Sequence, residues 1–326
     1  MKVAITGASG HIGSCLTREL IKRGDKVKVL IHNTNSSLQD LDVEIVKGDL
    51  LNKNSLEKLC SEVDVVFHLA AKIAIDKSER DLVYKTNVEG TQNLIDVCIS
   101  AGIQRFIHFS SIHAYDPHPL DEVLDETRAY IGKTKLVYEK SKAESERIVL
   151  DSVSKGLNAS VLNPTAVVGP FDFQGSYLGQ ALIKIYQNKL PMLVPGGYNW
   201  VDVRDVVDGS ISAISKGRIG ETYILSGHYL SLKELSLLIS KISKKRIPQF
   251  LAPLFLAKVG LPFINLYSNI TKDHPLYTGE SLHILKNSNK FISNEKAKKE
   301  FGYEPRPLFD TLKEAFAWYK QNGFVN

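Results

Sequence analysis

A glycine-rich segment near the amino terminus restricts the possible fold more than any other feature of the chain. It reads Thr6-Gly7-Ala8-Ser9-Gly10-His11-Ile12-Gly13 and directly follows the strand-like run 2–5. A glycine turn between a strand and a helix presents backbone N–H groups at the positive end of the helix dipole, where a diphosphate can bind. We therefore expect this loop to hold a dinucleotide cofactor. Its predicted contact residues are Gly7, Ser9, Gly10, His11, Ile12 and Gly13, with His11 as a spacer rather than a catalyst.

Short strand-like runs alternate with amphipathic helical runs through the first half of the chain. This alternation predicts a parallel sheet covered by helices on both faces. The expected strands are 2–5, 26–31, 43–46, 65–68, 105–109 and 159–162. The expected helices are 11–23, 55–61, 81–101 and 137–155, and glycine follows three of them as a left-handed stop, at Gly24, Gly102 and Gly156. The predicted fold class is α/β, a doubly wound parallel Rossmann sheet.

The rhythm changes after Pro164, where prolines and glycines become frequent and extended loops replace compact units. We therefore expect residues 1–164 to form the dinucleotide-binding domain. Residues 165–326 are expected to form mainly a smaller substrate-binding domain, with some segments returning to the first. The pair Ser231 and Glu234 forms a capping box that predicts a helix through Ile242, and a last helix is expected over 308–321.

Composition argues against several classes of protein. The 41 basic and 36 acidic residues are spread along the chain, so nucleic-acid binding is not expected. Cys15, Cys60 and Cys98 lack metal-ligand spacing and are typical of reduced core residues in a cytoplasmic protein, and no metal site is expected. No secretory leader is recognisable. The apolar stretch 250–270 is interrupted by prolines and a lysine, so we expect a lid, a subunit interface or a peripheral membrane contact instead of a membrane-spanning helix.

The residues after the second strand bear on the choice of cofactor. A carboxylate at this place usually binds the adenine ribose of NAD, whereas a cation accommodates the extra phosphate of NADP. The chain reads Ile31-His32-Asn33-Thr34-Asn35 and has no acid there. We therefore expect NADP, contacted by His32 and Asn33, with NAD as the alternative. Asp49 and Leu50, after the third strand, are candidates to flank the adenine, and an ordinary turn is the alternative for Asp49.

Tyr138 and Lys142 share one face of the predicted helix 137–155, because residues four apart are neighbours on a helix. A nearby ammonium stabilises phenolate, which would lower the pKa of the tyrosine and permit proton transfer near neutral pH. Ser110 and Ser111 end the strand 105–109, in the layer where a nicotinamide would lie, and a hydroxyl there can hydrogen-bond a carbonyl. This combination indicates an oxidoreductase.

The same motifs occur, in the same order, in the extended short-chain dehydrogenase/reductases (NAD-dependent epimerase/dehydratase family), which the chain resembles over nearly its whole length. Within that superfamily it is most similar to the dihydroflavonol-reductase-like and 3β-hydroxysteroid-dehydrogenase-like groups. The segments that carry the resemblance are Thr6–Gly13, His68-Leu69-Ala70-Ala71, Asn87-Val88-Glu89-Gly90-Thr91, Phe109-Ser110-Ser111, Tyr138-x-x-x-Lys142, Asn163–Pro170, Trp200–Val206 and Phe301–Pro307.

The resemblance implies a role for each matching residue. Tyr138 would be the general acid or base, and Lys142 would lower its pKa and hold the nicotinamide ribose. Ser111 would polarise the carbonyl, with Ser110 as the fallback, and Asn87 would order the site. The remaining implied cofactor contacts are Leu69, Ala70, Ala71, Pro164, Thr165 and Val167. A homodimer through the helices 81–101 and 137–155 is also implied.

Three functions compete on this basis. The leading hypothesis is reversible hydride transfer between NADP(H) and a carbonyl or secondary alcohol of a hydrophobic small molecule. The second is a nucleotide-sugar 4-epimerase or dehydratase with tightly bound NAD. Such epimerases commonly carry Arg-x-x-Asn-x-x-Gly-Pro, and Asn163 and Ala166 stand at the corresponding places here, which disfavours that reading. The third is a cofactor-sensing or assembly protein without catalysis, against which the Tyr138 and Lys142 pair argues.

Overall fold

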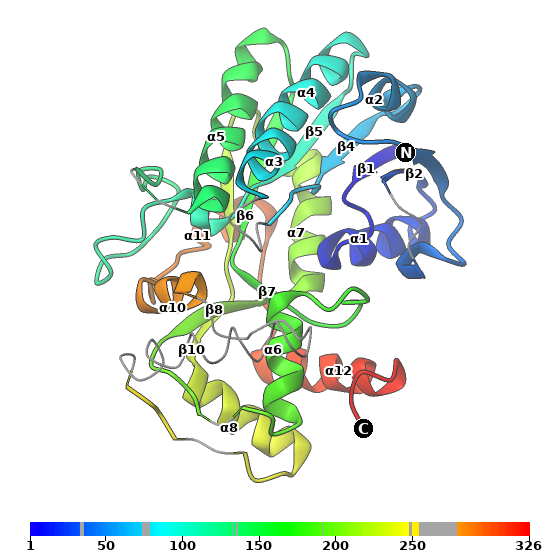
Figure 1. The fold of residues 1–326 in the computed structure, drawn as a ribbon. Coiled ribbons are helices and arrows are strands. Elements are labelled where there is room, and N and C mark those ends of the chain that lie inside the picture. Colours follow the sequence, from blue (N-terminus) through cyan, green and yellow to red (C-terminus); the bar gives the residue numbers. More distant parts are fainter. Residues whose placement is uncertain are drawn as a thin grey trace.

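The computed structural model describes residues 1–32, 36–73, 79–132, 134, 136–190, 192–247, 250–253 and 279–326. Within these residues, seven parallel strands form one sheet in the order β3-β2-β1-β4-β5-β6-β9 (Figure 1). The strands are β1 (Lys2–Thr6), β2 (Lys26–Ile31), β3 (Glu44–Lys47), β4 (Val65–His68), β5 (Arg105–Phe109), β6 (Ala159–Pro164) and β9 (Thr222–Leu225). The strand order reverses at β1, as in a doubly wound sheet, and the predicted fold class is confirmed.

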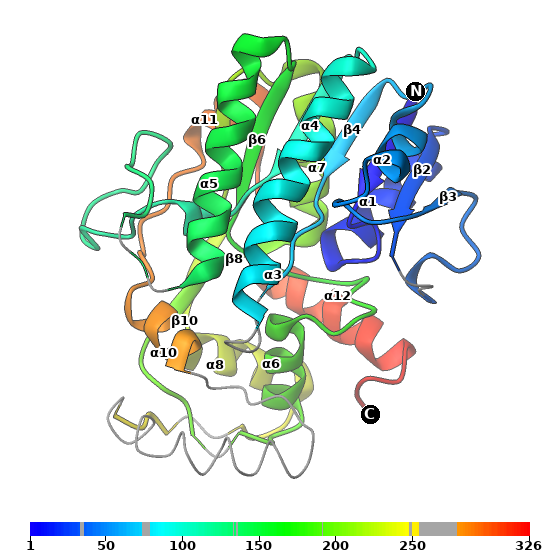
Figure 2. The ribbon, with the colours of Figure 1, turned by 45° about the horizontal axis from the view of Figure 1, so that its top comes forward.

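Helices cover both faces of this sheet, and the central strands are therefore almost wholly buried. One face packs against α1 (His11–Lys22), α7 (Val203–Lys216) and α11 (Glu295–Phe301). The other packs against α2 (Lys53–Cys60), α4 (Gly90–Ser100) and α5 (Val137–Asp151). Figure 2 shows α4 and α5 side by side in front of the sheet.

The register of the strands brings their carboxyl ends to one edge. Thr6 of β1 pairs with His68 of β4, and His68 pairs with His108 of β5. Phe109 of β5 in turn pairs with Leu162 of β6. The residues that follow these four strands therefore lie along the same edge, where sheets of this kind bind their ligands.

A second, smaller sheet lies beyond this edge, in the lower half of Figure 1. Within the described ranges it has the order β10-β8-β7. Its strands are β7 (Ala166–Val168), β8 (Gly197–Asp202) and β10 (His228–Ser231), and the helices around it are α6 (Tyr177–Tyr186), α8 (Leu232–Ser243), α10 (Gly279–Lys286) and α12 (Leu308–Gln321). Because β7 begins two residues after β6 ends, this layer is placed directly against the edge. From the second half of the chain, β9 and α7 join the large sheet and its helical cover.

Several predicted details differ from the structure. The helix expected over 81–101 consists of α3 (Arg80–Tyr84), a wide π turn over Lys85–Glu89 and α4. The helix expected over 137–155 ends at Asp151 and continues as a 3₁₀ turn. The capping box of Ser231 and Glu234 is confirmed. Of the apolar stretch 250–270, only 250–253 belong to the described residues. No helix among them combines the length and apolar character needed to cross a bilayer.

Candidate active site

Two glycines in the loop after β1 stand where the neighbouring backbone leaves no space for a side chain. Gly7 has a positive φ of 75°, and a Cβ on it would lie 2.6 Å from the backbone nitrogen of Ala70. A Cβ on Gly13 would collide with the Gly7 carbonyl oxygen and lie 2.8 Å from the Ala8 Cα. Gly10 precedes α1 without a side-chain cap, so the first N–H groups of this helix are available to an anion.

Contacts from two other segments hold this loop in place. The His11 Nε2 lies 3.0 Å from the carbonyl oxygen of Pro170, and the Ser14 hydroxyl donates to that of Phe171 at 2.8 Å. Arg18 donates to the carbonyl oxygen of Ser37 at 2.8 Å, and its guanidinium lies over the Phe173 ring. His11 thus joins the loop to the start of the second domain, a role that the sequence did not indicate.

The residues predicted to contact the adenosine occupy three different environments. His32 is exposed at the end of β2, and Asn33 lies outside the described residues. The Asp49 carboxylate accepts a hydrogen bond from the N–H of Leu51 at 2.7 Å. This is the ordinary turn contact that was the alternative to a position beside the adenine. Leu50 is 4% exposed and packs against Gly90 in the core.

The last residue of β4, His68, is hydrogen-bonded through both of its ring nitrogens. The His68 Nδ1 lies 2.7 Å from the Thr6 hydroxyl, and its Nε2 lies 2.8 Å from that of Thr91. Burial lowers the pKa of His68 to about 3, so the ring is neutral near pH 7. The chain then passes the glycine loop, where Leu69 donates to the Thr6 carbonyl oxygen, and Ala70 and Ala71 become progressively more exposed.

Asn87 sits in the π turn and is 2% exposed. Its side chain accepts the N–H of Lys72 at 2.7 Å and donates to the Lys72 carbonyl oxygen at 3.0 Å. It also donates to the Ser141 hydroxyl on α5 at 2.9 Å. π turns of this kind often occur at functional sites. Asn87 therefore joins the segment after β4 to the helix that carries Tyr138 and Lys142.

Ser111 and Tyr138 are brought together at the end of β5. Burial raises the pKa of Tyr138 to about 12, and the nearby Ser111 hydroxyl opposes that rise. Ser111 is 8% exposed and also accepts the N–H of His113, whose ring meets the edge of Tyr138 at 6.5 Å. The neighbouring Ser110 is on the opposite side, towards Glu146. Ser111, and not Ser110, is thus the serine at Tyr138.

Lys142 is almost fully buried one helical turn after Tyr138. Its ammonium donates to the carbonyl oxygen of Phe109 at 2.7 Å, and burial lowers its pKa to about 8. The expected lowering of the Tyr138 pKa by Lys142 does not appear in this arrangement. The reason is that the ammonium is directed to the backbone of β5, while removal from water disfavours the phenolate.

The strand β6 leads from this site to the second sheet. Pro164 is buried, and the Thr165 hydroxyl donates to Asn199 at 3.0 Å. Val167 is half-buried on β7. Asn163, for which no direct role was expected, donates to the backbone of Ser111 and to the carboxylate of Glu146. Glu146 itself gave no sequence signal beyond its position one turn after Lys142.

Comparisons with known proteins agree with this geometry. The model of the NAD dependent epimerase/dehydratase family matches residues 3–226. Sterol demethylase protein B of Methylococcus capsulatus is 28% identical over 329 residues, which cover 100% of both chains. The 2-alkyl-3-oxoalkanoate reductase of Stenotrophomonas maltophilia is 27% identical over 322 residues, covering 94% of this chain and 95% of that protein. The crystal structure of gox2253 superimposes with a TM-score of 0.85 at 31% identity, covering 100% of this chain and 99% of that one.

Proposed function

The chain belongs to the NAD dependent epimerase/dehydratase family and is an oxidoreductase of the extended short-chain type, and from this premise we propose that it transfers hydride between NADP(H) and a hydrophobic carbonyl compound or secondary alcohol. One observation carries the proposal. Ser111 and Tyr138 lie near each other at the carboxyl edge of the sheet, where the Ser111 hydroxyl acts to lower the pKa of Tyr138, and the buried ammonium of Lys142 lies one turn along the helix.

The residues of the glycine loop fit a dinucleotide. Gly7 and Gly13 let the loop pack directly against the backbone at Ala70 and Ala8, and the start of α1 offers uncapped N–H groups to the diphosphate. We infer that Gly7, Ser9, Gly10, Ile12 and Gly13 hold that group. His32 is exposed where a carboxylate selective for NAD would stand, which supports NADP.

NADPH, when bound, supplies the hydride. The side chains of the site orient the carbonyl oxygen and protonate it. Ser111 donates a hydrogen bond to that oxygen and orients it. Tyr138 donates the proton that the developing alkoxide takes up. Lys142, held by the carbonyl oxygen of Phe109, supplies a fixed positive charge that favours the negative charge developing on the substrate oxygen, and Asn87 holds α5 against the segment after β4. In the oxidative direction the same groups act in reverse.

The names of two relatives and the side chains on β6 and β7 support an apolar substrate. The two relatives are named for a sterol and for an alkyl-oxoalkanoate, both of which are largely apolar. The Asn163 amide nitrogen donates to Glu146 and to the backbone of Ser111, and Ala166 has no polar side chain. The position at which sugar-nucleotide epimerases commonly carry an asparagine therefore offers no polar group here. A homodimer through α4 and α5 stays a prediction.

Purified protein tests this proposal directly. NADPH should raise the Tm more than NADH does, and added apolar ketones should cause NADPH to be consumed in proportion to ketone reduced. An epimerase would instead contain bound NAD after purification and convert substrate without added cofactor. Protein that NADPH stabilises, but that turns over no carbonyl compound, would count against an enzyme of this specificity and favour a cofactor-sensing role.

Replacing Gly13 with alanine should weaken cofactor binding. The new methyl group would collide with the Gly7 carbonyl oxygen, so the loop must move away from the diphosphate. We expect the Kd for NADPH, measured by calorimetry, to rise at least about tenfold, the effect of losing one or two charge-assisted hydrogen bonds. Gly279→Ala is the matched control, because open space surrounds that position. Equal Kd values for both variants would show that the loop does not hold the cofactor.

A further inference from the structure

A buried carboxylate, Glu146, lies behind the hydroxyl pair and has no part in the mechanism above. It follows Lys142 by one turn of α5 and Tyr138 by two, so the three side chains project from one helix face. Glu146 is 0% exposed. A carboxylate in such a place is costly unless it is hydrogen-bonded and balanced by a positive charge. Its surroundings therefore indicate what it does.

Three side chains donate hydrogen bonds to the Glu146 carboxylate. Its Oε2 accepts the amide of Asn163 at 2.7 Å. Its Oε1 accepts the hydroxyl groups of Tyr115 and Tyr130, each at 3.2 Å. Burial raises the pKa of Glu146, and these donors oppose that rise. The ionised carboxylate can accept all three of these bonds, whereas a protonated one would have to donate to one of the tyrosine oxygens instead.

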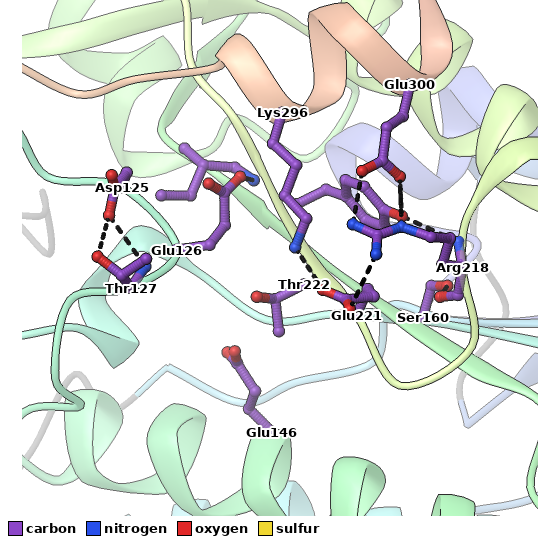
Figure 3. Close-up of polar contacts among 12 residues, drawn as sticks. Asp125, Glu126, Thr127, Glu146, Ser160, Arg218, Glu221, Thr222, Lys296 and Glu300 are labelled. Carbon is purple, nitrogen blue, oxygen red and sulfur yellow. Dashed lines mark hydrogen bonds and ion pairs between the residues drawn. The ribbon is translucent and has the colours of Figure 1, made fainter.

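Lys142 is the cation that shares a helix face with Glu146. Figure 3 shows Glu146 pointing from α5 towards Thr222 on β9, with Lys296 coming from α11 and Arg218 from the loop before β9. Both of those cations have other partners, since Lys296 pairs with Glu221 at 2.7 Å and Arg218 with Glu300 at 2.7 Å. On α5, Arg147 pairs with Glu144. Lys142 has no carboxylate partner within ion-pair distance in the described part of the chain, and the charge of Glu146 raises its pKa.

The same carboxylate holds the segment 111–115 at both ends. Asn163, which donates to Glu146, also donates to the carbonyl oxygen of Ser111 at 3.2 Å. At the other end, the Tyr115 hydroxyl donates to Glu146. The 3₁₀ turn Ile112–Ala114 lies between, with Ser111 as its amino-terminal cap and Tyr115 as its carboxyl-terminal cap. Movement of Glu146 would therefore move the serine that meets Tyr138.

We propose that Glu146 is a positioning residue: its carboxylate balances the charge of Lys142 and fixes the segment 111–115, which keeps Ser111 against Tyr138. This inference rests on the proposed function, because hydride transfer is the reaction that the positioned groups would serve. Glu146 acts through Lys142 and Ser111, and it reaches neither substrate nor cofactor.

The histidines and tyrosines around Lys142 and Glu146 do not change their protonation state near neutral pH. Burial lowers the pKa values of His68 and His108, from β4 and β5, and raises those of the nearby tyrosines. These tyrosines are Tyr115, Tyr130 and Tyr138. Arg147 faces the Tyr130 ring. The titration of Lys142 itself is expected near pH 8, away from those of the surrounding histidines and tyrosines.

The first test measures this titration without any reaction. Protein labelled with ¹³C at the lysine Cε gives a resonance for Lys142, which Lys142→Met identifies by its loss. In Glu146→Gln the pKa of Lys142 should fall by about one unit or more, the shift expected for two charges one helical turn apart. Glu144→Gln removes a charge from the same helix at a half-exposed position and should leave that pKa within about 0.3 units. An unchanged pKa in Glu146→Gln would overturn the counter-charge role.

The second test uses carbonyl reduction by the complete enzyme. Glu146→Gln should lower kcat about tenfold or more with little change in the KM for NADPH, and the alkaline limb of kcat should move to lower pH. Tyr115→Phe should lower kcat about fivefold, whereas Tyr130→Phe, which loses a bond to the same oxygen but lies outside the segment 111–115, should change it less than about twofold. Equal kcat values for the two tyrosine variants would overturn the anchoring role, even if Glu146→Gln does not fold. If no carbonyl compound is reduced, the proposed function fails, while the lysine titration still decides the charge pairing.

Discussion

Tyr138→Phe is expected to lower kcat for carbonyl reduction by ~10²–10⁴-fold, the usual contribution of a positioned general acid. The variant loses the hydroxyl that we propose as the proton donor, which lies near Ser111. The ring remains, so the half-buried surface it covers and the contact with His113 are retained. Ser111 still orients the carbonyl, and the KM for the ketone should therefore change little. Steady-state kinetics with NADPH and the best apolar ketone measure the effect.

The control for this substitution is Tyr229→Phe on β10, which in the strand order of the small sheet is separated from β7 by β8. Its kcat should equal that of the unmodified protein. The Kd of Tyr138→Phe for NADPH, obtained by calorimetry, should remain within about threefold, since one neutral hydrogen bond is at stake. Retention of full turnover by Tyr138→Phe would remove Tyr138 from the mechanism and direct attention to another acid near Ser111.

The large sheet could be predicted because the local sequence patterns favour the same strands and helices that the tertiary structure contains. The strand 26–31 and the helix 308–321 were predicted with the bounds they have in the structure. In the first, β-branched residues suit a strand buried on both faces, and in the second, two prolines set the start of an amphipathic helix. Gly24, Gly102 and Gly156 all have positive φ values, as their positions after helices required.

Other features depend on contacts between distant segments and leave little trace in a local pattern. The π turn around Asn87 continues a helical sequence, and its extra width shows only where Asn87 meets Lys72 and Ser141. In the sequence alone, Glu146 is typical of a surface acid on a helix. Its burial depends on Asn163 and on tyrosines that precede α5 by many residues. Pairings of this kind have to be seen in three dimensions.

The pKa shifts at the site could likewise be predicted only in part. The spacing of Tyr138 and Lys142 correctly placed both on one helix face, but it gave no measure of burial. In the folded chain, burial raises the pKa of Tyr138 and lowers that of Lys142. The two shifts have one cause, because removal from water disfavours the charged form of each group. The charge of Lys142 is thus more easily lost than its reference pKa suggests, and activity should depend on it.

Lys142→Met is accordingly expected to lower kcat on the order of 10²–10³-fold, the usual effect of removing one fixed charge that stabilises a developing charge in a transition state. The pH dependence gives a sharper result. Lys142 is cationic below its pKa of about 8 and neutral above it. Reduction by the unmodified enzyme should therefore be level below about pH 8 and fall as the pH rises further, and this limb should be absent from the residual activity of Lys142→Met.

Lys140→Met provides the matched control for that experiment. Lys140 precedes Lys142 by two residues on α5, is exposed, and lies over the ring of Tyr84 on the outer side of the helix. It should keep both the kcat and the alkaline limb of the unmodified enzyme, because its charge is solvated and screened. If Lys142→Met kept the limb with an unchanged midpoint, the titrating group would be a different one, and Lys142 would act only by holding the backbone of Phe109.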